Sequence, residues 1–182
     1  MTQKRMPTIV LIGRTNVGKS TLFNKLLEKH QALVSQIAGT TRDRNEGECV
    51  WRGKSIRVID TGGLDGDGTD EIEQNIKKQA DLAMEQADVI LFLVDVRDGL
   101  MPQEKELSEY ISNFDKPIIL VGNKAEKTTD RLSVNNPEWQ LPNLEAPIPI
   151  SGAKGTGVGD LLDKVYSILE KKGIPPIESV EI

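Results

Sequence analysis

Four short apolar runs, rich in β-branched residues and without regular polar alternation, recur along the chain. They occupy residues 9–12, 89–94, 118–121 and 148–150. Runs of this length and pattern are typical of strands that are buried on both faces of a parallel sheet. The pattern therefore predicts four buried strands that belong to one sheet.

The segments between these runs carry apolar residues at helical spacing. Apolar positions recur every three or four residues over 72–87, after Pro102 and over 158–169, and a further stripe begins at Leu22. Each stripe predicts an amphipathic helix, and Pro102 suits the first turn of its helix. Strands that alternate with helices predict an α/β fold with a doubly wound sheet.

One segment has a different pattern, because residues 46–52 and 55–60 flank Gly53-Lys54 as two strands flank a tight turn. This arrangement predicts an antiparallel hairpin. Together with the four buried runs it gives a mostly parallel sheet of six strands with one antiparallel edge strand. Residues 127–146 lack a long periodic element, so we expect a surface loop with room for a short helix.

Composition agrees with one ordinary globular domain, which we place at residues 7–172, with a linker or tail at 173–182 around Pro175-Pro176. The net charge of −5 argues against non-specific nucleic-acid binding, and we expect no sequence-specific DNA binding. The single cysteine excludes a disulfide framework. No apolar stretch approaches the roughly 20 residues of a membrane helix, so we expect no membrane partner and a cytoplasmic protein.

The most specific motif is Gly-Arg-Thr-Asn-Val-Gly-Lys-Ser-Thr at residues 13–21, which fits G-x-x-x-x-G-K-[ST]. The two glycines allow the backbone to turn and to present N–H groups to phosphates, Lys19 can reach the β- and γ-phosphates, and Ser20 can bind Mg²⁺. A strand precedes this phosphate-binding loop (P-loop) and a helix follows it, so the phosphates would lie at a helix N-terminus. The predicted fold is therefore a P-loop NTPase. The nucleotide-binding residues expected in the loop are Gly13, Arg14, Thr15, Asn16, Val17, Gly18, Lys19, Ser20 and Thr21.

Two further segments supply candidate ligands for Mg²⁺ and the γ-phosphate. Asp60-Thr61-Gly62-Gly63 follows a predicted strand, where Asp60 can hold Mg²⁺ and the Gly63 N–H can meet the γ-phosphate. The loop Gly39–Asp43 contains Thr41, which we expect to close on Mg²⁺ and the γ-phosphate as switch loops do.

The base is predicted from Asn123-Lys124-Ala125-Glu126, which has the form N-K-x-[DE] at the end of a predicted strand. The Glu126 carboxylate can accept hydrogen bonds from N1–H and the amine of guanine, whereas adenine has an acceptor at N1. The aliphatic stem of Lys124 can cover the base. Backbone N–H groups of Ser151, Gly152 and Ala153 can meet guanine O6, and the alternative for that segment is a glycine-rich turn before a helix.

These motifs together resemble those of the translation-factor-related GTPases, and the individual residues within them are similar to those of the Der/EngA ribosome-assembly GTPases. The resemblance covers roughly residues 7–172, and Asp95 with Gly99-Leu100 fits the first of that family's two tandem G domains. The segments that carry it are Asn16, Thr-Thr-Arg-Asp at 40–43, Asp-Thr-Gly-Gly-Leu at 60–64 and Gly-Val-Gly-Asp-Leu-Leu at 157–162.

The resemblance implies an Mg²⁺-dependent GTPase that cycles between GTP and GDP and supports assembly of the large ribosomal subunit. It also implies that the chain is one G domain of a longer protein and that potassium stimulates hydrolysis, with Asn16 as a K⁺ ligand. The residues expected to act in hydrolysis are Lys19, Asn16, Thr41 and Gly63.

Leu64 stands where Ras-like enzymes have a glutamine that orients water, so we expect slow intrinsic turnover. One alternative is therefore a GTP-binding module with negligible hydrolysis. Within the GTPases, the G domain of a tRNA-modification GTPase is a second alternative, because that family also has Thr-Thr-Arg-Asp. A P-loop kinase or ATPase has less support, since Asn123 and Glu126 favour guanine.

Overall fold

The computed structural model describes residues 5–34, 46–62 and 70–179 of the 182-residue chain. Seven strands form one sheet in the order β2-β3-β1-β4-β5-β6, and β7 pairs with β3 beside this path. The strands are β1 (Thr8–Gly13), β2 (Glu46–Trp51), β3 (Lys54–Asp60), β4 (Val89–Asp95), β5 (Ile118–Asn123), β6 (Ile148–Pro149) and β7 (Ile177–Glu178). The predicted α/β fold is confirmed, with seven strands in place of the expected six.

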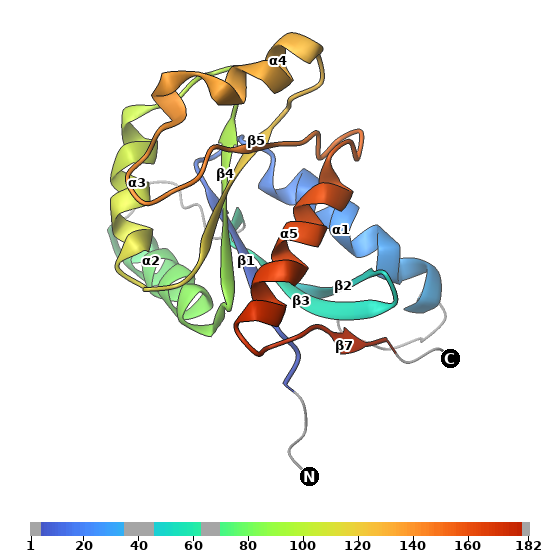
Figure 1. Ribbon diagram of the computed structural model, residues 1–182. Coiled ribbons are helices and arrows are strands. Elements are labelled where there is room, and N and C mark those ends of the chain that lie inside the picture. The colour runs from blue at the N-terminus through green and yellow to red at the C-terminus, as the bar shows by residue number, and fades with distance from the viewer. Residues whose placement is uncertain (1–4, 35–45, 63–69, 180–182) are drawn as a thin grey trace.

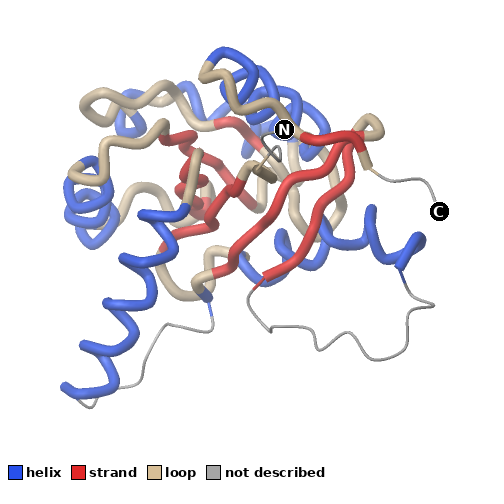
Figure 2. Tube along the Cα trace, turned by 90° about the horizontal axis from the view of Figure 1, so that it is seen from below, coloured by secondary structure: helices blue, strands red, loops and turns tan. Residues whose placement is uncertain are grey.

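Helices cover both faces of the sheet (Figure 1). Helices α1 (Lys19–Val34) and α5 (Val158–Lys171) lie on one side, and α2 (Asp70–Gln86) and α3 (Pro102–Ser112) lie on the other. Figure 2 shows the same layers from below, with the long β2–β3 hairpin at one side of the sheet. None of the helices in the described ranges is long and apolar enough to cross a bilayer.

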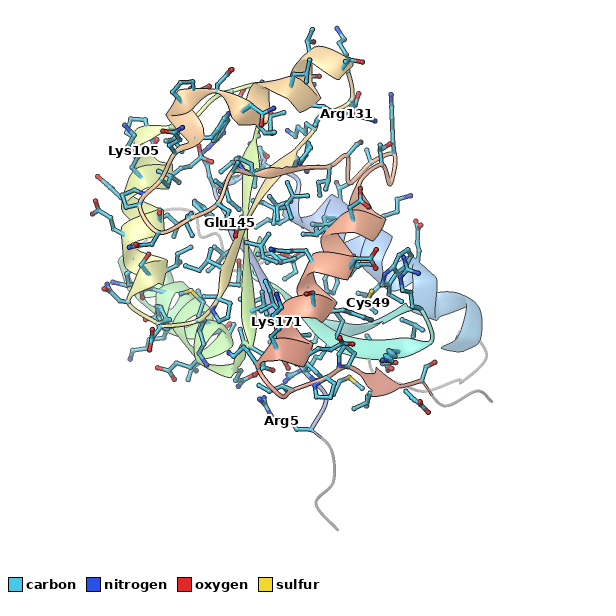
Figure 3. The ribbon with its side chains drawn as sticks, in the orientation of Figure 1. Arg5, Cys49, Lys105, Arg131, Glu145 and Lys171 are labelled. Carbon is cyan, nitrogen blue, oxygen red and sulfur yellow. The ribbon has the colours of Figure 1, made fainter. Side chains whose placement is uncertain are left out.

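The core explains why the central strands carry apolar residues at successive positions. In β1, Ile9 and Leu11 join a cluster with residues of α1 and α5, whereas Val10 and Ile12 join a second cluster with residues of α2 and α3. Alternate side chains of the strand thus point into opposite hydrophobic layers. Cys49 of β2, labelled in Figure 3, is fully buried in the first cluster.

The parallel register brings four strand ends together at one edge of the sheet. Leu11 of β1 pairs with Asp60 of β3, Gly13 pairs with Leu93 of β4, and Asp95 of β4 pairs with Asn123 of β5. The residues that follow these strands therefore meet above the carboxyl ends, where open α/β sheets bind ligands.

The predicted hairpin is present, but its turn lies one residue earlier than expected. Arg52 and Gly53 occupy the turn, both with positive φ (52° and 73°), and β3 begins at Lys54. Positive φ at both central positions is the geometry of a type I′ turn, which matches the twist of the flanking strands.

The seventh strand arises from the segment that looked like a linker. Ile177 and Glu178 of β7 pair antiparallel with Ser55 and Lys54, and the Ser179 N–H donates to the Gly53 carbonyl at 2.9 Å. Gly173, just after α5, has a φ of 75°, and residues 174–176 then lead the chain to the start of β3. So short a strand could not be predicted, because two residues are too few for a pattern of apolar alternation.

The segment between β5 and β6 contains the expected short helix, α4 (Thr128–Leu132), and two 3₁₀ turns at Ser133–Asn135 and Pro137–Trp139. It is less superficial than predicted, because Trp139 is buried (1% exposed) against the cluster on the α2–α3 side. A buried tryptophan fixes this otherwise irregular segment on the sheet.

Candidate functional site

The loop between β1 and α1 is shaped by two glycines that have no room for a side chain. A Cβ on Gly13 would lie 2.6 Å from the Leu93 carbonyl oxygen. A Cβ on Gly18 would lie 2.2 Å from Nδ2 of Asn123, and Gly18 also has a φ of 99°. The loop can therefore pack against β4 and the end of β5 only because both positions are glycine.

Lys19 begins α1 and is almost fully buried (4% exposed). Its ammonium group donates to the carbonyl oxygens of Gly13 and, at 3.2 Å, of Arg14. These contacts hold the charged end of Lys19 across the opening of the loop. A phosphate would therefore meet a cation at the N-terminus of a helix, where the backbone N–H groups also point outward.

Two adjoining pockets lie over the strand ends. The pocket next to the P-loop has a volume of about 390 Å³, and the pocket next to the residues after β5 has a volume of about 190 Å³. They share Gly18, Thr21 and Lys124. The first is completed by Thr15, Asn16, Lys19, Ser20 and Gly62, and the second by Arg97, Asn123, Glu126, Ser151 and Ala153.

Asp60 and Ser20 meet at the edge of the larger pocket. Ser20 Oγ donates to Asp60 Oδ2 at 3.3 Å, and the Gly62 N–H donates to Asp60 Oδ1 at 2.8 Å. A hydroxyl and a carboxylate side by side are the hard oxygen donors that Mg²⁺ prefers, so this pair fits the predicted metal. Among the described residues no group of three His, Cys, Asp or Glu side chains could hold a metal ion. Thr41 and Gly63 lie outside the described residues.

Asn123 is a brace between two loops. Its Nδ2 group donates to the Val17 carbonyl at 2.8 Å, and its Oδ1 atom accepts from the Gly152 N–H at 2.9 Å. The side chain is 2% exposed, so both hydrogen bonds are shielded from water. Asn123 thus fixes the P-loop and the 151–153 turn relative to each other, and the Gly152 N–H is already used within the protein.

Lys124 lies where the two pockets join. Its Nζ donates to the Asn16 carbonyl at 2.7 Å and is 3.1 Å from Asp95 Oδ2. Asp95 is 3% exposed and also accepts from the Arg97 N–H at 2.9 Å. Burial raises the pKa of Asp95, but the hydrogen bonds and charges of Arg97 and Lys124 outweigh it and hold this pKa below its usual range.

Glu126 lies at the rim of the smaller pocket. Its side chain is 38% exposed, and Oε2 is 3.7 Å from Nζ of Lys154. The Ala125 N–H donates to the Ile150 carbonyl, which ties this loop to the turn at 151–153. The predicted base-binding residues Asn123, Lys124, Glu126, Ser151 and Ala153 are thus brought together around one pocket.

Arg14 lies in the P-loop, but its side chain is directed away from both pockets toward the start of α3. Its Nη2 is 3.0 Å from Asp98 Oδ2, and its Nε is 4.0 Å from Oε1 of Glu104. Glu104 is completely buried and accepts from the Met101 N–H at 2.9 Å. Burial raises the pKa of Glu104, and the charges of Asp98 and Asp95 add to the rise, while Met101 and Arg14 only partly offset it.

The sequence reasoning missed Arg97, which lines the smaller pocket, and it missed Asp98 and Glu104, which contact Arg14 of the P-loop. A signal for Glu104 was present, because it lies three positions before Leu107 and seven before Ile111 on the apolar stripe of α3. A charged residue on such a stripe needs a partner when buried. Nothing in the sequence pattern pointed to Arg97.

The family model described as the 50S ribosome-binding GTPase matches residues 8–124, which is more than half of the chain. The chain belongs to the 50S ribosome-binding GTPase family. The match spans β1 through Lys124, so it includes the P-loop, Asp60 and the start of the base-binding loop.

Curated relatives of this GTPase family member are proteins named GTPase Der. The protein from Amoebophilus asiaticus is 45% identical over 157 residues, which cover 86% of this chain and 36% of the relative. The protein from Caldicellulosiruptor saccharolyticus is 42% identical over 176 residues, covering 97% of this chain and 40% of the relative. The chain therefore spans about 40% of the length of these relatives.

Solved structures of Era share the fold of the chain. A single-residue variant of Aquifex aeolicus Era bound to GDP.AlF4⁻ has a TM-score of 0.71 and 30% identity, covering 88% of this chain and 56% of that one. Era in complex with MgGDPNP and nucleotides 1506–1542 of 16S ribosomal RNA has a TM-score of 0.67 and 29% identity, covering 99% of this chain and 60% of that one.

Proposed function

We propose that the chain binds GTP and GDP with Mg²⁺ and hydrolyses GTP to GDP and phosphate. The observation that carries this proposal is the pair of adjoining pockets, one lined by the P-loop and the other by the base-binding loop, with Lys124 in both. A nucleotide needs a base site and a phosphate site that adjoin in this way. Membership of the GTPase family supports the same conclusion.

Each part of the nucleotide has a group to receive it. In the proposed complex the Glu126 carboxylate accepts hydrogen bonds from N1–H and the amine of guanine, and the stem of Lys124 covers the ring. P-loop N–H groups and Lys19 bind the phosphates, while Ser20 and Asp60 hold Mg²⁺. The metal would neutralise charge that develops on the phosphates during hydrolysis. Thr41 and Gly63 keep their predicted roles at Mg²⁺ and the γ-phosphate.

Asn16 is proposed to bind a potassium ion that stimulates hydrolysis. It lines the larger pocket and has a φ of 71°, and the bond from Lys124 to its carbonyl secures this left-handed conformation. An amide oxygen beside the phosphates is a suitable ligand for a monovalent cation. Such a cation would supply positive charge at the phosphates, where Leu64 offers no hydrogen bond to the attacking water.

The proposed partner is the large ribosomal subunit or its precursor. The description of the matching family, 50S ribosome-binding GTPase, supports this proposal. We further propose that the chain acts in the cytoplasm as one G domain of a longer protein, over residues 7–172.

The alternative is a module that binds GTP but hardly hydrolyses it, which the leucine at position 64 favours. Phosphate release from GTP, measured in matched KCl and NaCl, separates the two functions. We expect turnover about tenfold or more faster in potassium for the wild-type chain. Tight GTP binding without turnover in either salt, with or without 50S subunits, would favour the binding module.

Asn16→Gly tests the potassium site, because glycine keeps the positive φ while it removes the side chain. We expect this variant to hydrolyse GTP at the same slow rate in both salts. Asn135→Gly, at an exposed position outside both pockets, is the control and should keep the difference. Equal rates in the two salts for the wild-type chain would refute the potassium proposal and would leave the proposal that the chain binds GTP unaffected.

A further inference from the structure

Asp95 is a buried carboxylate beneath the nucleotide site. It ends β4 and pairs in register with Asn123 of β5. It lines neither pocket, so it would not touch a bound nucleotide. Its side chain is nevertheless joined to two residues that do line the smaller pocket, Lys124 and Arg97.

The contact with Lys124 is the more informative of the two. Lys124 has a φ of 64°, a left-handed conformation that is unfavourable for lysine, and its ammonium group has two described acceptors. One is Asp95 Oδ2 at 3.1 Å, and the other is the Asn16 carbonyl at 2.7 Å. Asp95 therefore fixes the direction of a side chain that would otherwise sample many rotamers in an open pocket.

Asp95 also contacts Arg97, another residue that lines the smaller pocket. The Arg97 N–H donates to Asp95 Oδ1 at 2.9 Å, and its Nε is 3.6 Å from the same oxygen. The Arg97 side chain is about half exposed at the mouth of the pocket. Each oxygen of Asp95 thus serves one of the two cationic residues around the base site.

We propose that Asp95 is a positioning residue for the nucleotide, which acts through Lys124 to hold the base-binding stem and the Asn16 carbonyl of the P-loop in one fixed arrangement. This inference rests on the proposed function, because it assumes that Lys124 covers a guanine base. Asp95 would couple the two pockets. Loss of its charge removes one of the two acceptors that hold the Lys124 ammonium group, so the cover of the base and the support of the P-loop weaken together.

A double-mutant cycle on GDP affinity tests the proposal. Asp95→Asn keeps the shape of the side chain and removes its charge, and we expect it to weaken GDP binding about tenfold, the usual effect of losing one buried charged hydrogen bond. Lys124→Met keeps an aliphatic stem over the base. In the Lys124→Met background, Asp95→Asn should change GDP affinity by less than about twofold, because the side chain through which Asp95 acts is gone.

Three comparisons make the result specific. Arg97→Ala leaves the Arg97 N–H in place, so the Asp95→Asn effect should persist in that background. Asp163→Asn, on α5 and outside both pockets, should bind GDP like the wild type. The ratio of GDP to IDP affinity should stay unchanged in Asp95→Asn, because Glu126 reads the amine that inosine lacks.

The outcomes separate this inference from the proposed function. If the wild-type chain does not bind GDP, the proposed function fails. If it binds GDP but Asp95→Asn has no effect, or has the same effect with Met at 124, the positioning role is wrong. Thermal unfolding of each variant shows whether it folds, and Asp95→Ser, whose hydroxyl can still accept the Arg97 N–H, provides a second neutral variant for the same cycle.

Discussion

Both ends of the Asn123 amide are bonded inside the protein, the Nδ2 group to Val17 and the Oδ1 atom to Gly152. The sequence motif predicts that Asn123 binds the base, and in the structure its side chain lines the smaller pocket and links two loops through these hydrogen bonds. Spacing along the chain reports which residues gather at a site. It does not report which of their atoms are already used by neighbouring backbone, because that depends on loop geometry.

At the residue scale, the contact between Arg14 and Glu104 is the feature that the sequence motif predicted least. Arg14 occupies a variable position of the motif, so the motif says nothing about the direction of its side chain. In the structure, Arg14 Nε and Glu104 Oε2 are buried and have no hydrogen-bond partner among the described residues. The pair therefore holds the P-loop against α3 at a cost in desolvation.

Replacement of Glu104 by Gln should change how stability depends on pH. The pKa of Glu104 is raised in the folded protein, so folding favours the protonated carboxyl group. The stabilisation that this group adds to the free energy of unfolding is fully present below the unfolded pKa and is lost as pH rises through the folded pKa. Glutamine does not titrate. The unfolding free energy of Glu104→Gln minus that of the wild type should therefore rise as the pH increases from about 4.5, the ordinary pKa of the group, to the raised pKa of the folded state, by about 1.4 kcal/mol for each unit of pKa shift.

Urea unfolding at a series of pH values measures this difference. Glu106→Gln, an exposed neighbour on the same helix, is the matched control and should give a much flatter profile. A difference between Glu104→Gln and wild type that is constant with pH would mean that Glu104 is not held in an environment that disfavours its charge.

At the scale of elements, the hydrophobic pattern predicted the buried strands and the main helices because burial determines the pattern of both. Strands buried on both faces are apolar throughout, and helices buried along one stripe are apolar every three or four residues. The pattern failed where burial is local. The start of β3 pairs with two residues of β7, and the segment before β6 packs on the molecule through a few separated side chains, among them Trp139 and Leu141. Neither contact leaves a periodic signal.

Removal of residues 177–182 tests the role of β7. The truncation deletes the pairs with Lys54 and Ser55 and the hydrogen bond from Ser179 to Gly53. We expect the unfolding free energy to fall by about 2 kcal/mol, as for the loss of two or three hydrogen bonds. GDP affinity should not change, because β7 lies at the start of β3 and Asp60 lies at its end. Weaker GDP binding by a fully folded truncated chain would contradict this separation.

On the scale of the whole molecule, the fold explains why motifs far apart in the sequence act together. The parallel strands end at one edge, and residues after β1, β3, β4 and β5 line or support the two pockets there. The candidate chemistry is therefore concentrated at this edge of the sheet. Lys105, Arg131 and Lys171, labelled in Figure 3, belong to α3, α4 and α5 and line neither pocket.

The central claim is that these pockets select a guanine nucleotide. Equilibrium titration of the chain with GDP and with ADP, in Mg²⁺ and potassium, tests it most directly. We predict that GDP binds at least about a hundredfold more tightly than ADP, because adenine would leave the Glu126 carboxylate without its donors. We also expect Lys19→Ala to abolish tight binding of GDP. Equal affinity for GDP and ADP, or tight GDP binding that survives Lys19→Ala, would show that these pockets do not select a guanine nucleotide in this way.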